Sequence, residues 1–152
     1  MGYMCSNCFC IVSSIDISEQ KLIKSIKNKY SVEKYKCNKC KTCSVIEIDD
    51  IIMKAIQILN NKGYITEYCC SGHLDESDTN TYISFKSGKC PNEIPKGFIL
   101  EDEKYYNMNN WKKTNESLCI RKWYRNSEDL AKQLLQTGID LIDWAESLND
   151  LQ

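Results

Sequence analysis

Four of the ten cysteines in this 152-residue chain form two Cys-x2-Cys pairs, a spacing typical of the thiolate ligands of structural zinc. The first pair is Cys5 and Cys8, and the second pair, 28 residues further on, is Cys37 and Cys40. Each pair can form a tight turn, here called a knuckle, that presents two sulfurs to one ion. The sequence therefore predicts a zinc-ribbon-like module with one tetrahedral four-cysteine site.

Two further cysteines lie beside the knuckles and leave the choice of ligands open. Cys8-x-Cys10 and Cys40-x2-Cys43 are also ligand spacings, although we prefer the matched Cys-x2-Cys pairs. The alternative is that all six residues are ordinary thiols. Four protein ligands leave no coordination position for water or a substrate, so the predicted zinc ion is structural.

Charge is distributed unevenly along the chain, which can indicate a nucleic-acid-binding face. Residues 1–43 carry eight lysines against three acidic residues, whereas residues 44–152 carry twelve basic and eighteen acidic residues. Four lysines flank the second knuckle: Lys34, Lys36, Lys39 and Lys41. They offset the net charge of about −2 that four thiolates give a zinc site. The charge pattern is therefore only weak support for nucleic acid as a partner.

The only histidine, His73, ends the stretch EYCCSGH, which also contains two adjacent cysteines. Residues 64–70 have the composition of a strand, and strand alternation sends Cys69 and Cys70 to opposite faces. Cys70 is then expected to share its face with three residues: Tyr64, Thr66 and Tyr68. The pair Ser71-Gly72 permits a tight turn that returns His73 towards the end of the strand.

Three kinds of chemistry suit this stretch. Cys70 as a thiolate and His73 as a base would make a nucleophile. Cys69 or Cys70 with His73 and Cys90 would make a second metal site, with Asp75 as a fourth ligand. Third, the backbone amides of the turn and His73 would bind an anion or a partner. The alternative to all three is a packed turn with a hydrogen-bonded imidazole.

We predict a candidate binding site rather than a set of catalytic residues. It consists of Cys70, Ser71, Gly72 and His73, which we call the CSGH turn. Arg121 is added because its planar guanidinium suits phosphate or carboxylate groups, and arginine is rare in this lysine-rich chain.

The sequence of residues 64–73, Tyr-Ile-Thr-Glu-Tyr-Cys-Cys-Ser-Gly-His, resembles the strand-turn motif of the wybutosine-synthesis protein 3 family, Tyr-Phe-Thr-Thr-Ser-Ser-Cys-Ser-Gly-Arg. The resemblance covers residues 50–86 and implies a related fold there, together with methyl transfer from S-adenosylmethionine to a modified guanosine of tRNA. His73 replaces the arginine of that family, and the zinc ribbon is not part of it. The whole layout is more similar to zinc-ribbon proteins with a "CSGH" turn from AT-rich Firmicutes and their phages, a resemblance that implies no particular reaction.

Hydrophobic periodicity predicts the elements that position these residues. A helix over residues 17–30 between the knuckles would begin at Ser18 as its N-cap, and its apolar stripe would be Leu22, Ile23, Ile26 and Tyr30. After a strand at residues 44–48, a second helix would begin at Asp49 or Asp50 and end before Gly63. Its buried stripe would be Ile51, Ile52, Ala55, Ile56 and Leu59.

Further strands are expected at residues 64–70, 81–86 and 118–124. Residues 87–115 lack a sustained period and are predicted to be a long loop, with a short strand at residues 97–100. A C-terminal helix over residues 127–148 would pack through a seam of small and apolar residues: Leu130, Leu134, Gly138, Leu141, Ala145 and Leu148.

These patterns predict an α+β fold, with an N-terminal four-cysteine zinc ribbon packed on a mixed β-sheet that two or three helices flank. Residues 1–46 would form the ribbon-like module with its inserted helix. Residues 47–152 would form the α+β core. The chain has no apolar run that would span a membrane and no signal-peptide pattern, so we expect a cytoplasmic protein whose cysteines are reduced.

We expect a small zinc-stabilised binding protein, encoded by a phage, that engages a macromolecular target. A host defence nucleoprotein that the chain inhibits suits this expectation. The alternative is an enzyme or ligand-binding protein related to the wybutosine-type methyltransferases, with a pocket around Cys70 and His73.

Overall fold

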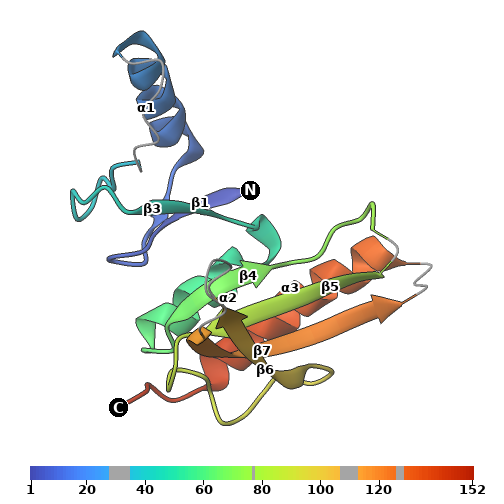
Figure 1. Ribbon diagram of the computed structural model, residues 1–152. Coiled ribbons are helices and arrows are strands. Elements are labelled where there is room, and N and C mark those ends of the chain that lie inside the picture. Colours follow the sequence, from blue (N-terminus) through green and yellow to red (C-terminus); the bar gives the residue numbers. More distant parts are fainter. Residues whose placement is uncertain (28–34, 77, 107–112, 126–128) are drawn as a thin grey trace.

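The computed structural model describes residues 1–27, 35–76, 78–106, 113–125 and 129–152 (Figure 1). Within them lie three helices and seven strands, which confirms the α+β class. In chain order the elements are β1 (Gly2–Cys5), β2 (Ile11–Val12), α1 (Ser14–Lys27), β3 (Val45–Ile48), α2 (Asp50–Asn61), β4 (Thr66–Cys70), β5 (Asp78–Phe85), β6 (Ile99–Tyr106), β7 (Lys113–Arg125) and α3 (Leu130–Ser147).

The strands form two separate antiparallel sheets instead of the predicted mixed sheet. One sheet has the order β2-β1-β3 and the other the order β4-β5-β7-β6. The prediction of a mixed sheet was wrong because it treated β3, α2 and β4 as a crossover within one sheet. Instead α2 connects β3 in the smaller sheet to β4 in the larger one, so no parallel pair is needed.

Helices α2 and α3 lie together on one face of the larger sheet, behind it in Figure 1. The stripe of α2 is buried as predicted, with Ile52, Ala55, Ile56 and Leu59 in the core. The α3 seam is also confirmed, with Leu134, Gly138, Leu141 and Ala145 buried. The sheet contributes Ile83, Phe85 and Ile120 to the same core. The other face of this sheet, here called the open face, is covered by neither α2 nor α3.

A second, smaller core lies beneath the knuckles. It consists of Tyr3, Cys5, Val12, Ile17, Cys37 and Val45. Helix α1 supplies Ile17, and the side-chain amide of Gln20 bonds the backbone N–H and C=O of Lys36, at 2.7 and 2.9 Å. This small core holds the two knuckles side by side, although they are far apart in sequence.

Helix α1 begins earlier than the sequence indicated. The chain turns into the helix at Ser14, and the Ser13 hydroxyl accepts a hydrogen bond from the Ile15 N–H. Ser18 lies inside the helix, where its hydroxyl donates to the Ser14 carbonyl, so its predicted N-cap role was wrong. The predicted apolar stripe was also wrong at Leu22, whose side chain is 64% exposed. Tyr30 lies outside the described residues.

The module and the larger core touch through a shared set of apolar residues. Met4 from β1 and Ile48 from β3 are buried in the main core, and the Gln57 side chain of α2 donates to the Phe9 carbonyl at 2.9 Å. The predicted division at residue 46 falls within β3, all of whose residues pair with β1. Two separate domains therefore stay a prediction.

The segment predicted as a long loop contains strand β6 of the larger sheet and the first residues of β7. Strand β6 occupies residues 99–106 and β7 begins at residue 113, so the prediction was wrong for this part. The alternation was hidden by the acidic run Glu101-Asp102-Glu103, which lies within the β6–β7 pairing. No helix of the described residues is long and apolar enough to cross a bilayer.

Candidate functional site

The first knuckle is a tight turn between β1 and β2. The Phe9 N–H donates to the Cys5 carbonyl at 2.9 Å, and the Cys5 N–H donates to the Cys10 carbonyl at 3.0 Å. Phe9, the residue after Cys8, has φ of 53°, a left-handed conformation that residues other than glycine rarely adopt. This turn brings the sulfurs of Cys5 and Cys8 within 4.8 Å of each other.

The second knuckle repeats the same pattern. The Lys41 N–H donates to the Cys37 carbonyl at 3.0 Å, and the Cys37 N–H donates to the Thr42 carbonyl at 2.8 Å. Lys41, the residue after Cys40, has φ of 64°. The two knuckles therefore match residue by residue, a symmetry that their Cys-x2-Cys spacing alone indicates only in part.

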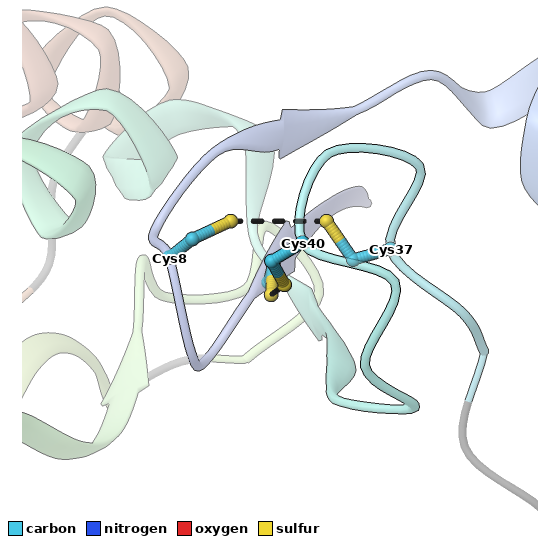
Figure 2. Close-up of side chains that lie close together, drawn as sticks. Cys8, Cys37 and Cys40 are labelled. Carbon is cyan, nitrogen blue, oxygen red and sulfur yellow. Dashed lines mark hydrogen bonds between the residues drawn. The ribbon is translucent and has the colours of Figure 1, made fainter.

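The four predicted ligand sulfurs lie within 4.8 Å of one another. Cys5 and Cys40 are 3.6 Å apart, and Cys8 and Cys37, which point toward each other in Figure 2, are 3.8 Å apart. A tetrahedral site with Zn–S bonds of about 2.3 Å has sulfur–sulfur edges of roughly 3.8 Å. The donor set and its spacing thus fit a zinc ion held by Cys5, Cys8, Cys37 and Cys40.

Hydrogen bonds prepare part of this cluster for metal binding, which requires thiolates. The Thr42 hydroxyl lies 3.0 Å from the Cys40 sulfur and, with the Thr42 backbone N–H and the Asn7 side chain, lowers the pKa of Cys40 to about 5. Burial opposes ionisation of Cys5, but hydrogen bonds from the Ser44 hydroxyl and from the backbone outweigh it and lower the Cys5 pKa. For Cys37, burial dominates and raises the pKa.

The two remaining N-terminal cysteines differ from each other. Cys43 is exposed, whereas the Cys10 sulfur lies 3.3 Å from that of Cys8 and 3.4 Å from that of Cys37. The symmetry of the knuckles makes Cys10 the counterpart of Thr42. Threonine is not a zinc ligand, so this position in the second knuckle is not a ligand position. Cys10 is therefore a neighbour of the predicted ligands.

Protein-family models, curated proteins and solved structures were all compared with the chain. None of them matches it.

A second metal site is not formed where the sequence suggested one. In the described part of the chain, the four cysteines of the knuckles are the only group of three or more metal-ligating residues that lie together. Cys69 packs against the main core, and its pKa is raised to about 12 by burial. The Cys90 sulfur contacts the Pro91 carbonyl. The hypothesis of a site from Cys69 or Cys70, His73 and Cys90 is therefore wrong.

The CSGH turn does bring Cys70 and His73 together. The Cys70 sulfur lies 3.4 Å from Nε2 of His73 and accepts from the Gly72 N–H at 3.3 Å. Gly72 has φ of 93°, which favours glycine, and an added Cβ there would lie only 3.0 Å from the Thr79 hydroxyl. The His73 N–H donates to that hydroxyl, and the His73 side chain is exposed.

Asp49, which the sequence predicted only as a possible helix cap, also holds the CSGH turn. Asp49 occupies the N-cap position of α2, but its side chain makes no capping hydrogen bond. Its carboxylate instead accepts from the Ser71 N–H at 2.9 Å. The Ser71 carbonyl accepts from the buried Thr81 hydroxyl at 2.9 Å. The turn is thus fixed at both the N–H and the C=O of Ser71, and only the tertiary fold shows this.

The electrostatics of the turn disfavour a nucleophilic role for Cys70. Burial is the largest influence on this thiol and, with the negative charge of Asp49 nearby, raises the Cys70 pKa. A raised pKa reduces the thiolate fraction near neutral pH, and the thiolate is the nucleophile. The geometry of the Cys70–His73 pair instead suits hydrogen bonding to a ligand or a partner.

Arg121 lies on the open face in the same row of the sheet as Cys70. Cys70 pairs with Tyr82, and Tyr82 pairs with Arg121, so all three side chains lie on one face. The Arg121 guanidinium donates to Glu101 at 2.7 Å and to Asn80 at 2.6 Å. Glu101 and Asn80 thus hold Arg121 in place, and strand β5 with Tyr82 separates it from Cys70.

Two expected neighbours of Cys70 do not share its face. Tyr64 is instead buried in the main core. A register shift between Thr66 and Tyr68 places Thr66 opposite Phe85 and Tyr68 opposite Ser84. Thr66 therefore turns toward α2, where its backbone N–H and hydroxyl both bond the Asn60 side chain, whereas Tyr68 lies on the open face with Cys70. Strict alternation cannot anticipate this shift.

We predict that His73→Ala leaves the free energy of unfolding within about 0.5 kcal/mol of the wild-type value, because the side chain is exposed. Urea denaturation followed by circular dichroism measures this change. Thr79→Val is the matched comparison, since it removes the buried hydroxyl that accepts from the His73 N–H, and it should cost about 1–3 kcal/mol. A loss of that size in His73→Ala would assign His73 to the core.

Proposed function

We propose that the protein is a small cytoplasmic binding protein, stabilised by one structural zinc ion, that engages a macromolecular target through the open face of its larger sheet. The observation that supports binding through the open face is the set of aromatic side chains around Arg121. This residue stacks on Tyr82 at 4.9 Å and on Trp123 at 5.6 Å, measured to the ring centroids.

Several side chains on the open face are accessible to a partner. Tyr68 is 56% exposed and Trp123 is 43% exposed, and Ile99 pairs with Arg121 in the same row. Tyrosine, tryptophan and arginine are the residue types that dominate the energy of protein interfaces. Because hydrogen bonds to Glu101 and Asn80 hold the Arg121 side chain, little of its side-chain entropy would be lost on binding.

The charge of this surface favours a protein partner over bare nucleic acid. The Arg121 charge is balanced by Glu101, and residues 44–152 carry more acidic than basic residues. Binding to a phosphate backbone depends on cationic side chains that displace counterions. The target class that we propose is a protein or the protein part of a nucleoprotein. A host defence complex inhibited by a phage-encoded protein is the biological setting that we infer.

The test is affinity capture from extracts of Firmicutes cells, followed by titration of the purified target. Trp123→Ala should weaken binding roughly tenfold or more, as loss of an interface hot spot does. Leu22→Ala is the matched control, because it removes another exposed large side chain that lies far from the open face on α1. Equal affinities for wild type and Trp123→Ala would contradict the open face as the binding surface.

A cavity beside the CSGH turn favours a second candidate function. It has a volume of about 380 Å³ and is lined mainly by apolar side chains, including Ile51, Leu74 and Leu134, together with His73. Its size lies within the range of small-molecule sites. A ligand-binding role related to the wybutosine-type methyltransferases would place S-adenosylmethionine there. A rise in melting temperature with S-adenosylmethionine that His73→Ala abolishes would favour this candidate over the first.

A further inference from the structure

Cys10 and Thr42 occupy equivalent positions in the two knuckles. The Thr42 hydroxyl lies 3.0 Å from the Cys40 sulfur and 4.0 Å from the Cys5 sulfur. Across the site, the Cys10 sulfur lies 3.3 Å from the sulfur of Cys8, on its own knuckle. It also lies 3.4 Å from that of Cys37, on the other knuckle. Each position thus places one side chain against one ligand of each knuckle.

Comparison of Cys10 with Thr42 shows what a thiol at this position can do that a hydroxyl cannot. A hydroxyl can donate a hydrogen bond to a thiolate, and a thiol can do the same more weakly. Only the thiol can also be oxidised and then joined to a neighbouring sulfur. Cys10 is half-buried, whereas Cys37 is fully buried. An oxidant therefore reaches Cys10 more readily than Cys37.

We propose that Cys10 is an oxidation site that couples peroxide to release of the metal. Hydrogen peroxide oxidises the Cys10 thiol to a sulfenic acid, and the peroxide is reduced to water. The thiolate sulfur of Cys8 or Cys37 then attacks the Cys10 sulfur and expels the sulfenic oxygen, which takes up a proton from solvent and leaves as a second water molecule. One disulfide forms for each peroxide consumed, and the electrons come from the two sulfurs.

The disulfide removes one of the four predicted ligands. A sulfur in a disulfide is no longer a thiolate, so three ligands remain for the ion and its affinity falls. This inference rests on the proposed zinc centre. Bound zinc is therefore measured before any oxidant is added, so that failure of the metal site can be distinguished from failure of the Cys10 role.

Cys10→Thr is the decisive variant because it gives the first knuckle the side chain that the second already has. Cys10→Ser is a second variant that keeps a hydroxyl donor, and Cys43→Ser controls for an exposed cysteine without a role in the site. Each protein is purified with zinc and treated with hydrogen peroxide. Zinc release is followed with a metal-sensitive dye, and disulfides are mapped by mass spectrometry.

The proposal predicts that wild type and Cys43→Ser release zinc together, with a disulfide that includes Cys10. Both Cys10 variants should bind zinc normally and release it at no more than roughly one tenth of the wild-type rate. Equal release rates in wild type and the Cys10 variants would overturn the proposal, as would a disulfide that does not include Cys10. A wild-type protein purified without zinc would overturn the metal centre itself and the inference with it.

Discussion

Replacing the two cysteines of the second knuckle together, Cys37→Ser and Cys40→Ser, is expected to reduce bound zinc from about one ion per chain to almost none. The double variant leaves only the sulfurs of the first knuckle, and even with Cys10 these are fewer than a tetrahedral site requires. Structural zinc is worth roughly 10–16 kcal/mol in isolated peptides, so the ribbon module should unfold with the metal lost.

Elemental analysis measures the zinc, and nuclear magnetic resonance reports the loss of ordered signals from the small core around Ile17 and Val45. Cys43→Ser, which alters an exposed cysteine, should retain about one zinc ion per chain. Retention of zinc by the double variant would show that the knuckles do not hold the ion. A chelator added to wild type should reproduce the spectrum of the double variant.

Gly138→Ala should destabilise the protein by about 1–3 kcal/mol, although alanine favours an isolated helix over glycine by about 1 kcal/mol. Gly138 lies where α3 crosses α2. An added Cβ would lie 2.7 Å from both the carbonyl oxygen and the Cγ2 atom of Ile51. The carbonyl belongs to the α2 backbone, so the two helices would have to separate. Urea denaturation measures the change.

A double variant separates the two contacts at this helix crossing. Ile51→Ala removes the Cγ2 atom but leaves the carbonyl oxygen. When Ile51→Ala is added to Gly138→Ala, only the contact with the Cγ2 atom is relieved. After the cost of Ile51→Ala alone is subtracted, part of the destabilisation by Gly138→Ala should therefore remain. Gly88→Ala is a useful comparison because it is a glycine with open space around the added Cβ, although its φ of 70° adds backbone strain. A Gly138→Ala protein as stable as wild type would contradict close packing of α2 against α3.

The features that the sequence predicted well are those with short-range signals. The α2 stripe repeats at helical spacing, and its end at Gly63, with φ of 91°, follows from the conformational freedom of glycine. The Cys-x2-Cys pairs identified sulfurs that lie together in the fold. In both cases, neighbouring residues carry enough information to define the local geometry.

The features that the sequence missed depend on residues that meet only in the folded chain. The role of Asp49 at the CSGH turn requires contact with Ser71, 22 positions later. The register shift in β4 depends on its pairing with β5, and β6 is stabilised by pairing with β7 despite its acidic residues. Cys10 gains its place beside Cys37 only when the knuckles assemble. Tertiary contacts override local preference at each of these positions.

Asp49 connects the two candidate sites through a single residue. It follows Ile48, the last residue of β3, and its carboxylate bonds the N–H of Ser71. The strand that completes the ribbon sheet thus leads directly into the group that positions the CSGH turn. Thermodynamic linkage makes any such coupling reciprocal. If metal loading tightens the binding of a ligand at the turn by some factor, that ligand tightens metal binding by the same factor, so cellular zinc supply and ligand occupancy of the turn would report on each other.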